Sequence, residues 1–479
     1  MGETLNSKAK KFIKNFSYTI ISNIISLIVS SLVVLIIPKI IGVNDYGFWQ
    51  LYLFYSSYVG FLHFGWNDGI YLRYGGKKYE ELNKRLFHSQ FIMLLVLQVV
   101  IAALVFIISI IFIVDLNRGF IFRTLAVNMI LVNSRYLYLY ILQATNRIKN
   151  YAQITILDRL IYISLVIFML LLGTKRFELL IIADLIGKIC SLMYAMSCCR
   201  EIAFNSIISF ETNLKEMIAN ISIGIKLMFA NIASMLLIGV VRFGIERTWN
   251  VATFGKVSLT LSISKLIMIF INAVGLIMYP LLRRSDYKKL TNIYGVMRNV
   301  LMAVTLGVLV FQYPLKILLN YWLPDYEDGL KYMVLIFPMF LYEGKMSLLI
   351  NTYFKTLRKE KIMLRINLLA LLVSIILTVI NTVLLKNLNM TVLSIVIILA
   401  FRSISSELIL SKLISIKVTK DIIYEQILVI IFILSAWATN SISSVIIYSI
   451  SYFIYIFIKR KDIKLTVDEI KEMLLTKTY

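Results

Sequence analysis

Apolar stretches of about 20 residues recur along the chain from Lys11 to Lys459, and short polar loops separate them. An α-helix of this length spans the hydrocarbon core of a bilayer, because it rises about 1.5 Å per residue across roughly 30 Å. The pattern therefore predicts an all-α polytopic membrane protein. We expect about 14 membrane helices, at residues 15–37, 47–67, 87–114, 120–143, 153–173, 178–199, 221–247, 254–279, 293–313, 330–353, 363–385, 391–411, 426–439 and 442–458. The last two are short, so one re-entrant hairpin is the alternative for them.

The composition agrees with this pattern, and the placement of charge gives an orientation. Hydrophobic residues make up 59% of the 479 residues, and the mean hydropathy is +0.83, which leaves too little polar surface for a soluble protein. A formal net charge of +24 would suggest nucleic-acid binding in a soluble chain. With the N-terminus inside, however, about 32 Lys and Arg fall in the termini and inner loops and about 6 in the outer loops. The charge therefore predicts cytoplasmic N- and C-termini and no nucleic-acid partner.

Two similar outer turns indicate an internal repeat with an offset of six helices. Residues 43–47 join the first two helices and residues 251–255 join the seventh and eighth, and each turn ends in an aromatic residue followed by glycine. Duplicated helix bundles are common in transporters, with the substrate site at their interface. The predicted organisation is an N-lobe at 1–199, a cytoplasmic interfacial linker at 200–220, a C-lobe at 221–411, two further helices at 412–458 and a cytoplasmic amphipathic tail at 459–479.

Several functional classes are disfavoured by what the sequence lacks. The longest predicted outer loop, residues 314–329, leaves no room for an extracytoplasmic catalytic domain. The phosphate-binding pattern GxxxxGK[ST] does not occur. Cys190, Cys198 and Cys199 lie near the inner end of one helix and lack the spacing of a zinc site. We therefore expect no enzyme activity, metal or cofactor, which leaves transport, signalling or scaffolding.

Charged residues inside the predicted helices are candidates for a functional site, because each costs at least ~2.5 kcal/mol at a helix centre and so faces a cavity or a partner. The candidate cations are Arg135, Lys188, Lys265, Lys345 and Arg402. Arg135, Lys265 and Arg402 have no acidic residue three or four positions away on the same helix. They predict a water-filled cationic cavity for an anionic substrate, and guanidinium suits phosphate because its planar fork donates two parallel hydrogen bonds.

Alternative interpretations apply to several of these residues. Asp184 and Lys188 lie four residues apart on one helix, so they can equally form a local structural ion pair. Polar side chains that could contact sugars are also present, although most tyrosines of a membrane protein anchor it at the interface. They are Tyr55, Tyr58, Asn67 and Tyr138.

Several short segments follow one another along the chain in a characteristic order. A Lys-rich start precedes the first helix, and a glycine-containing second helix ends near Arg73. The further segments are Ile40-Ile41-Gly42-Val43-Asn44-Asp45-Tyr46-Gly47, Gln143-Ala144-Thr145-Asn146-Arg147, Tyr279-Pro280-Leu281-Leu282 and Leu323-Pro324-Asp325-Tyr326. In their order and in the topology, these segments resemble the O-antigen and capsule repeat-unit flippases of the Wzx type, and the resemblance covers nearly the whole chain.

This resemblance implies the fold of the multidrug/oligosaccharidyl-lipid/polysaccharide (MOP) exporters, in which two six-helix lobes surround a central cavity and helices 13 and 14 are appended. The implied role is to move an undecaprenyl-diphosphate-linked oligosaccharide from the inner to the outer leaflet of the bacterial inner membrane. A polysaccharide polymerase and assembly proteins would be further partners. The candidate couplers of a driving proton or sodium ion are Asp158, Asp184, Glu343 and Glu407.

Other functions remain open from the sequence. A lipid-linked peptidoglycan precursor flippase would use a similar basic cavity. A multidrug cation exporter of the same fold would need carboxylates to outnumber cations inside the helices, whereas the cations predominate here. A non-transporting scaffold would pair all of its intramembrane charges between helices.

Overall fold

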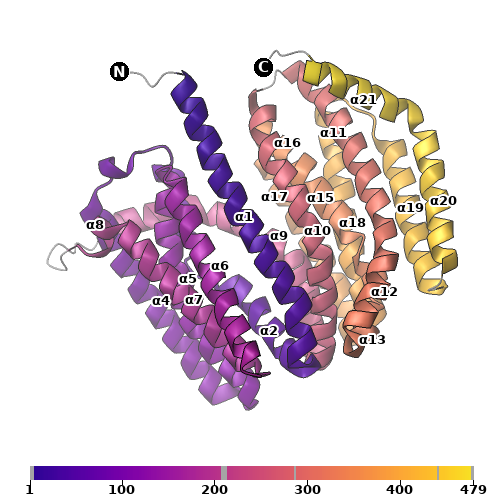
Figure 1. Ribbon diagram of the computed structural model, residues 1–479. Coiled ribbons are helices and arrows are strands. Elements are labelled where there is room, and N and C mark those ends of the chain that lie inside the picture. The colour runs from indigo at the N-terminus through magenta and orange to yellow at the C-terminus, as the bar shows by residue number, and fades with distance from the viewer. Residues whose placement is uncertain (1–4, 206–212, 285–286, 440–441, 476–479) are drawn as a thin grey trace. The chain divides into compact units, whose positions relative to one another are not determined.

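Helices form all the regular secondary structure in the part of the chain that the structure describes (Figure 1). The structure is a computed structural model, and it describes residues 5–205, 213–284, 287–439 and 442–475. Among these residues, 12 helices are long and apolar enough to cross a membrane. A bent pair, α20 (Ile442–Ile458) with α21 (Arg460–Leu475), raises the number to 13. The prediction of an all-α polytopic membrane protein is confirmed.

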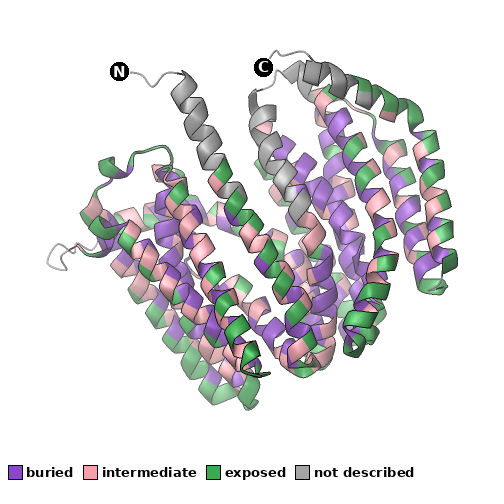
Figure 2. Cartoon of the chain, viewed as in Figure 1, coloured by how far each residue is buried: buried purple, intermediate pink, exposed green. Residues whose placement is uncertain are grey.

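The chain divides into two compact units, residues 1–232 and residues 233–479. Unit 1 contains α1 (Leu5–Ile41), α2 (Val43–Val59), α3 (Trp66–Tyr74), α4 (Lys84–Phe112), α5 (Leu116–Ala144), α6 (Ile148–Leu171), α7 (Phe177–Cys198), α8 (Arg200–Ala203) and the first part of α9 (Leu214–Thr248). The central helix of this unit is α5, which packs against α2, α3, α4, α6 and α7. In contrast, α4 exposes many large apolar side chains, as expected for a helix that faces lipid. Figure 2 colours the exposed residues of the chain green.

The predicted helix at residues 47–67 is interrupted in the structure, so the expectation of one continuous helix was wrong. α2 ends at Val59 and α3 begins at Trp66. Between them, Phe64 and Gly65 have φ angles of 53° and 82°, and a left-handed backbone cannot continue a right-handed helix. The Gly65 amide donates a hydrogen bond to His63 Nδ1 at 3.0 Å, which stabilises the turn.

Helices α3 and α9 approach each other through glycines. A Cβ atom on Gly224 would lie 1.9 Å from the Gly65 carbonyl oxygen, and a Cβ atom on Gly69 would lie 1.9 Å from the Asn220 carbonyl oxygen. Only glycine permits this backbone contact. Beyond the glycines, Arg73 forms an ion pair with Glu216 at 2.6 Å.

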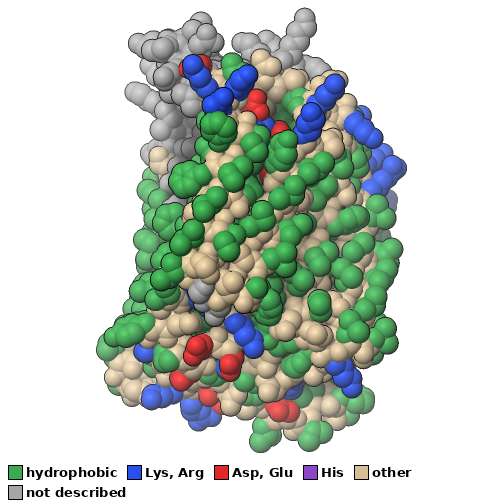
Figure 3. All heavy atoms as spheres, turned by 90° about the vertical axis from the view of Figure 1, so that its right-hand side faces the viewer, with side chains coloured by type: hydrophobic (Ala, Val, Ile, Leu, Met, Phe, Trp, Pro, Cys, Tyr) green, Lys and Arg blue, Asp and Glu red, His purple; other side chains and the backbone are tan. Residues whose placement is uncertain are grey.

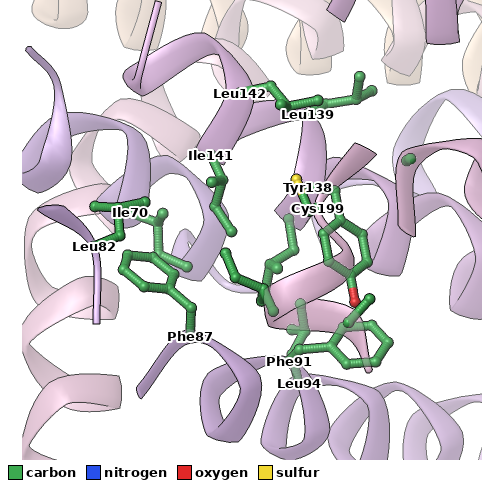
Figure 4. Close-up of a cluster of buried hydrophobic side chains, with 14 of the residues drawn as sticks. Ile70, Leu82, Phe87, Phe91, Leu94, Tyr138, Leu139, Ile141, Leu142 and Cys199 are labelled. Atoms are coloured by element: carbon green, nitrogen blue, oxygen red, sulfur yellow. The ribbon is translucent and has the colours of Figure 1, made fainter. Parts of the chain in front are cut away.

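The main hydrophobic cluster of unit 1 lies where α3, α4, α5 and α8 meet (Figure 4). It includes Ile70, Phe87, Leu94 and Tyr138, all almost completely buried. The buried Cys199 belongs to the same cluster, which gives this cysteine a packing role. The predicted linker at 200–220 holds α8 and the start of α9, and residues 206–212 lie outside the described residues.

Unit 2 is built around the central segment Met333–Thr356, most of whose residues are buried. The segment is not a regular helix, because Pro338 follows α14 (Met333–Ile336) and a π-helix, η5 (Lys345–Ile350), follows α15 (Met339–Gly344). The other elements of the unit are α10 (Val251–Arg284), α11 (Tyr287–Val308), α12 (Gln312–Trp322), α13 (Glu327–Leu330), α16 (Asn351–Thr356), α17 (Glu360–Val379), α18 (Leu388–Leu413), α19 (Thr419–Ala438), α20 and α21.

The surface of the molecule matches a membrane environment. On the face shown in Figure 3, hydrophobic side chains fill the middle, and Lys, Arg, Asp and Glu gather toward the two ends. Helix α21, within the predicted tail 459–479, packs against α11. The predicted lobe and linker boundaries themselves stay predictions.

Candidate functional site

Two of the candidate cations in unit 1 contact two of the candidate coupling residues. Arg135 Nη1 on α5 lies 2.9 Å from Asp158 Oδ2 on α6, and Lys188 Nζ lies 2.5 Å from Asp184 Oδ2 one turn earlier on α7. The side chains of all four residues are at most 8% exposed. The Tyr52 hydroxyl also donates a hydrogen bond to Asp184 Oδ2 at 2.7 Å. These buried charges are therefore compensated within unit 1.

A closed ring of four charges lies inside unit 2. It joins Arg298 on α11, Lys345 on η5, Glu407 on α18 and Glu425 on α19, and each of the four side chains is at most 2% exposed. Arg298 lies 2.6 Å from Glu407 and 2.7 Å from Glu425, and Lys345 lies 2.7 Å from each of the two carboxylates. Two positive and two negative charges alternate around this ring. Arg298 also lies 3.3 Å from the partly exposed Asp421, which in turn pairs with Lys459, so the ring continues into a larger ion-pair network.

Sequence analysis found only half of this ring. Lys345 and Glu407 were candidates, whereas Arg298 and Glu425 were not named. Arg298 lies within the predicted helix 293–313, so its charge inside an apolar stretch was the available signal. Glu425 precedes the predicted helix 426–439 by one residue, and in the structure α19 begins earlier, at Thr419, which places Glu425 inside the helix.

Arg402 is also paired across helices. Its Nη1 lies 3.3 Å from Glu343 Oε1, its Nε donates to Asn367 Oδ1 at 2.9 Å, and its Nη2 donates to Ser234 Oγ at 3.1 Å. The Arg402 side chain is 2% exposed, whereas the Glu343 carboxylate is 26% exposed. Glu343 is therefore the candidate coupling residue that solvent reaches most easily.

Lys265 differs from the other candidate cations, because its side chain is exposed. It lies near the middle of α10, one of the least apolar candidate spans. Its charged neighbours are Arg242 and Glu343, and no carboxylate among the described residues lies within ion-pair distance of its ammonium group. An exposed ammonium in the middle of a membrane helix indicates a wet surface rather than lipid.

The four candidate sugar contacts fall into two groups. Tyr138 and Asn67 are completely buried, Tyr138 in the hydrophobic cluster of Figure 4 and Asn67 with its Nδ2 donating to the Asn133 carbonyl oxygen at 3.1 Å. Tyr55 and Tyr58 on α2 are half-buried. The Tyr55 ring lies 5.0 Å from Phe122, measured between ring centroids. Only this second pair offers accessible ring surface.

No protein-family model matches this chain, and no curated protein sequence matches it. Among solved structures, its fold is similar to that of the lipid II flippase MurJ in an inward closed conformation, with a TM-score of 0.65 and 12% identity over 94% of this chain and 99% of the other. It is also similar to an inward-facing multidrug resistance MATE family transporter of the MOP superfamily, with a TM-score of 0.63 and 13% identity over 82% and 98% of the two chains.

A third similar structure is a MATE protein in the straight conformation, with a TM-score of 0.53 and 13% identity over 85% of this chain and 96% of the other. The structural similarity establishes a common fold, whereas sequence identities of 12–13% leave the substrate open. The predicted fold class is thus confirmed, and the chain has the fold of the MOP superfamily transporters.

Proposed function

We propose that this protein is a flippase that moves undecaprenyl-diphosphate-linked oligosaccharides from the inner to the outer leaflet of a bacterial inner membrane, for O-antigen or capsule synthesis. The observation that carries this proposal is the exposed, unpaired ammonium of Lys265 within a membrane helix. An uncompensated charge at this depth is costly unless it contacts water or a ligand of opposite charge. A diphosphate in the membrane is such a ligand.

The groups around Lys265 favour an anion over a cation. The charged neighbours of Lys265 are Arg242 and Glu343, and the Glu343 carboxylate is already paired with Arg402. A drug cation would meet net repulsion there, whereas a diphosphate would gain charge-assisted hydrogen bonds. Similarity to a lipid II flippase over 94% of the chain supports a lipid-linked cargo.

The mechanism that this geometry supports is alternating access. The diphosphate binds at Lys265, the polar sugars occupy the water-filled space, and the lipid tail stays in the bilayer. Rocking of the two helical repeats then exposes the bound headgroup to the opposite leaflet. Glu343 is the most exposed of the four candidate coupling residues, and its protonation would break the ion pair with Arg402. Loss of this pair would change the free-energy difference between the inward-open and outward-open states.

The test is deletion of the gene, followed by measurement of surface polysaccharide and of the leaflet in which undecaprenyl-linked oligosaccharide accumulates. The native protein and Lys265→Arg are expected to restore both, because each keeps a positive charge. Lys265→Gln is expected to fold and to leave the oligosaccharide in the inner leaflet.

The matched control is Lys256→Gln, which changes a lysine on the same helix that pairs with Asp328. It is expected to restore export. Normal polysaccharide and normal sidedness in the deletion strain would contradict the flippase proposal. Loss of lipid II translocation instead would identify a peptidoglycan precursor as the cargo.

A further inference from the structure

Four tyrosines of unit 1 form a strip that the established fold does not explain. They come from three helices: Tyr71 on α3, Tyr136 and Tyr140 on α5, and Tyr151 on α6. The ring centroids of Tyr71 and Tyr140 are 5.8 Å apart, and those of Tyr136 and Tyr140 are 6.1 Å apart. The Tyr151 phenol lies within electrostatic range of Tyr71 and Tyr136. We call these four residues the tyrosine strip.

The tyrosine strip is partly accessible. All four side chains are half-buried. Tyr136 and Tyr151 pack against the hydrophobic cluster that contains Tyr138 and Phe91. Gly60, in the break between α2 and α3, leaves room for the Tyr136 ring, since a Cβ atom there would lie 3.0 Å from Tyr136 Cε2.

Three of the four phenol groups of the strip are available for a ligand. Tyr140 is hydrogen-bonded to the Asp68 carboxylate. For the hydroxyl groups of Tyr71, Tyr136 and Tyr151, no hydrogen-bond partner is present among the described residues. A hydroxyl group that both donates and accepts matches the hydroxyl groups of a carbohydrate.

The surroundings argue against contact with lipid. Helix α5 is among the least apolar of the candidate spans, whereas α4, which exposes many apolar side chains, is the most apolar. Tyrosines that anchor a protein at the membrane interface are expected near helix ends. Tyr136 lies two turns before the end of α5 at Ala144, next to the buried Arg135, whereas the other three tyrosines lie about one turn from a helix end. The position of Tyr136 therefore distinguishes the strip from a set of interface anchors.

We propose that the tyrosine strip is a binding subsite for sugar rings of the cargo. The inference rests on the proposed function, because it concerns the oligosaccharide part of that cargo. The π face of a tyrosine ring is negatively polarised and attracts the positively polarised C–H groups on one face of a pyranose ring. The free phenol groups then bind the equatorial hydroxyl groups at the rim of the sugar.

An organic cation is the competing ligand for an aromatic surface, because cations bind ring faces. The Arg135 guanidinium already lies 6.0 Å from the Tyr136 ring centroid, and its charge is paired with Asp158. A cationic probe in the binding experiment therefore distinguishes an organic cation from a sugar.

The test measures binding of two lipids to the full-length protein in nanodiscs. One lipid is the undecaprenyl-linked oligosaccharide that accumulates in cells lacking the gene, and the other is sugar-free undecaprenyl diphosphate. The double variant Tyr136→Leu with Tyr140→Leu is expected to bind the glycosylated lipid about tenfold more weakly, because two ring contacts are lost. Its affinity for the sugar-free lipid should be unchanged.

Two control variants make the outcome specific. Tyr136→Phe with Tyr140→Phe keeps both rings and should retain most of the affinity for the glycosylated lipid. Tyr424→Leu removes an exposed tyrosine from α19 and should change neither affinity. A double leucine variant that fails to fold is replaced by Tyr71→Leu alone, which carries the same expectation with a smaller effect.

The two lipid affinities together decide whether the tyrosine strip binds sugars. Equal loss of affinity for both lipids, or no loss for either, overturns the sugar subsite. If the leucine variants lose affinity for tetraphenylphosphonium while their lipid binding is unchanged, the sugar subsite is also overturned, and the strip is assigned to cations. If the native protein binds neither lipid, the proposed function fails, whereas preferential binding of the sugar-free lipid leaves the flippase proposal intact and rejects the subsite.

Discussion

The ammonium group of Lys345 lies 2.7 Å from the carboxylate of Glu425, and these side chains are at most 2% exposed. The first residue belongs to the central π-helix of unit 2 and the second to α19. This contact attaches α19 to the interior of the unit through charge, in addition to packing. The predicted six-helix C-lobe ends at residue 411 and excludes α19. The ring of four charges therefore joins α19 to the C-lobe, and both belong to unit 2.

Removing one carboxylate from the ring should destabilise the protein. Glu425→Gln leaves Arg298 and Lys345 with Glu407 as their one fully buried carboxylate, since Asp421 beside Arg298 is partly exposed. Breaking a buried ion pair costs about 3–5 kcal/mol. We expect a clear fall in the thermal midpoint, measured by size-exclusion chromatography after heating in detergent. Asp328→Asn, which alters a pair whose carboxylate is 81% exposed, should change stability by less than about 1 kcal/mol. Equal midpoints for the two variants would contradict a structural role of the ring.

The pair formed by Arg135 and Asp158 should behave as one energetic unit. Arg135→Gln and Asp158→Asn should each lower the folded yield, because each leaves an uncompensated buried charge. The double variant should recover part of that yield, with a coupling energy of about 0.5–3 kcal/mol. The measurement is a double-mutant cycle of thermal midpoints in one detergent. Additive losses would show that the two charges act independently.

Measuring export by the same double variant shows whether Arg135 only pairs with Asp158 or also binds the substrate. If the variant folds and exports normally, Arg135 serves the structure. If it folds but leaves oligosaccharide in the inner leaflet, Arg135 also contacts the cargo. The corresponding double variant of Lys188 and Asp184 serves as the comparison, because this pair lies within one helix.

The glycine contact between α3 and α9 predicts an asymmetric response to alanine. Gly224→Ala should reduce the folded yield strongly, because its Cβ atom would lie 1.9 Å from a backbone oxygen that cannot move alone. Gly295→Ala, in α11, meets no atom within 4 Å and should be neutral or stabilise by about 0.5–1 kcal/mol through helix propensity. Yields from fluorescence-detected chromatography provide the comparison. A well-folded Gly224→Ala variant would show that the two helices do not pack this closely.

The orientation predicted from the basic residues has a direct test. In a chain with its three cysteines changed to serine, Asn117→Cys should react with a membrane-impermeant thiol reagent in intact cells, because the exposed first turn of α5 is predicted to lie at the outer side. Lys77→Cys, in the predicted inner loop before α4, should react only after the cells are permeabilised. The reverse pattern of labelling would invert the topology.

The sequence predicted the helices well because each bilayer crossing leaves a long apolar signal. It did not predict the break between α2 and α3, since Gly60, Phe64 and Gly65 interrupt the helix without interrupting the hydrophobic pattern. Glycines at 60, 65 and 69 were the only local signal, and glycine also occurs within intact membrane helices.

The charged residues were identified more reliably than their partners. Arg135, Arg402 and Lys265 were chosen by one rule, the absence of an acid nearby on the same helix. In the structure the first two have acidic partners on other helices, and only Lys265 is exposed. Which residues face each other depends on helix rotation and on contacts between distant segments, and neither is encoded in the spacing along one helix.

The ring in unit 2 also affects the order in which helices enter the bilayer during synthesis. Arg298 precedes Glu407 by 109 residues, and Lys345 precedes Glu425 by 80 residues. During translation the ribosome therefore delivers two cationic segments to the insertion machinery well before the last carboxylate has been synthesised. A lone charge costs about 2.5–3.5 kcal/mol on transfer from the translocon to lipid. Release of α11 and the central segment into the bilayer is thus expected to wait for α19, so that a chain stopped before residue 419 would remain at the translocon and become a substrate for quality-control proteolysis.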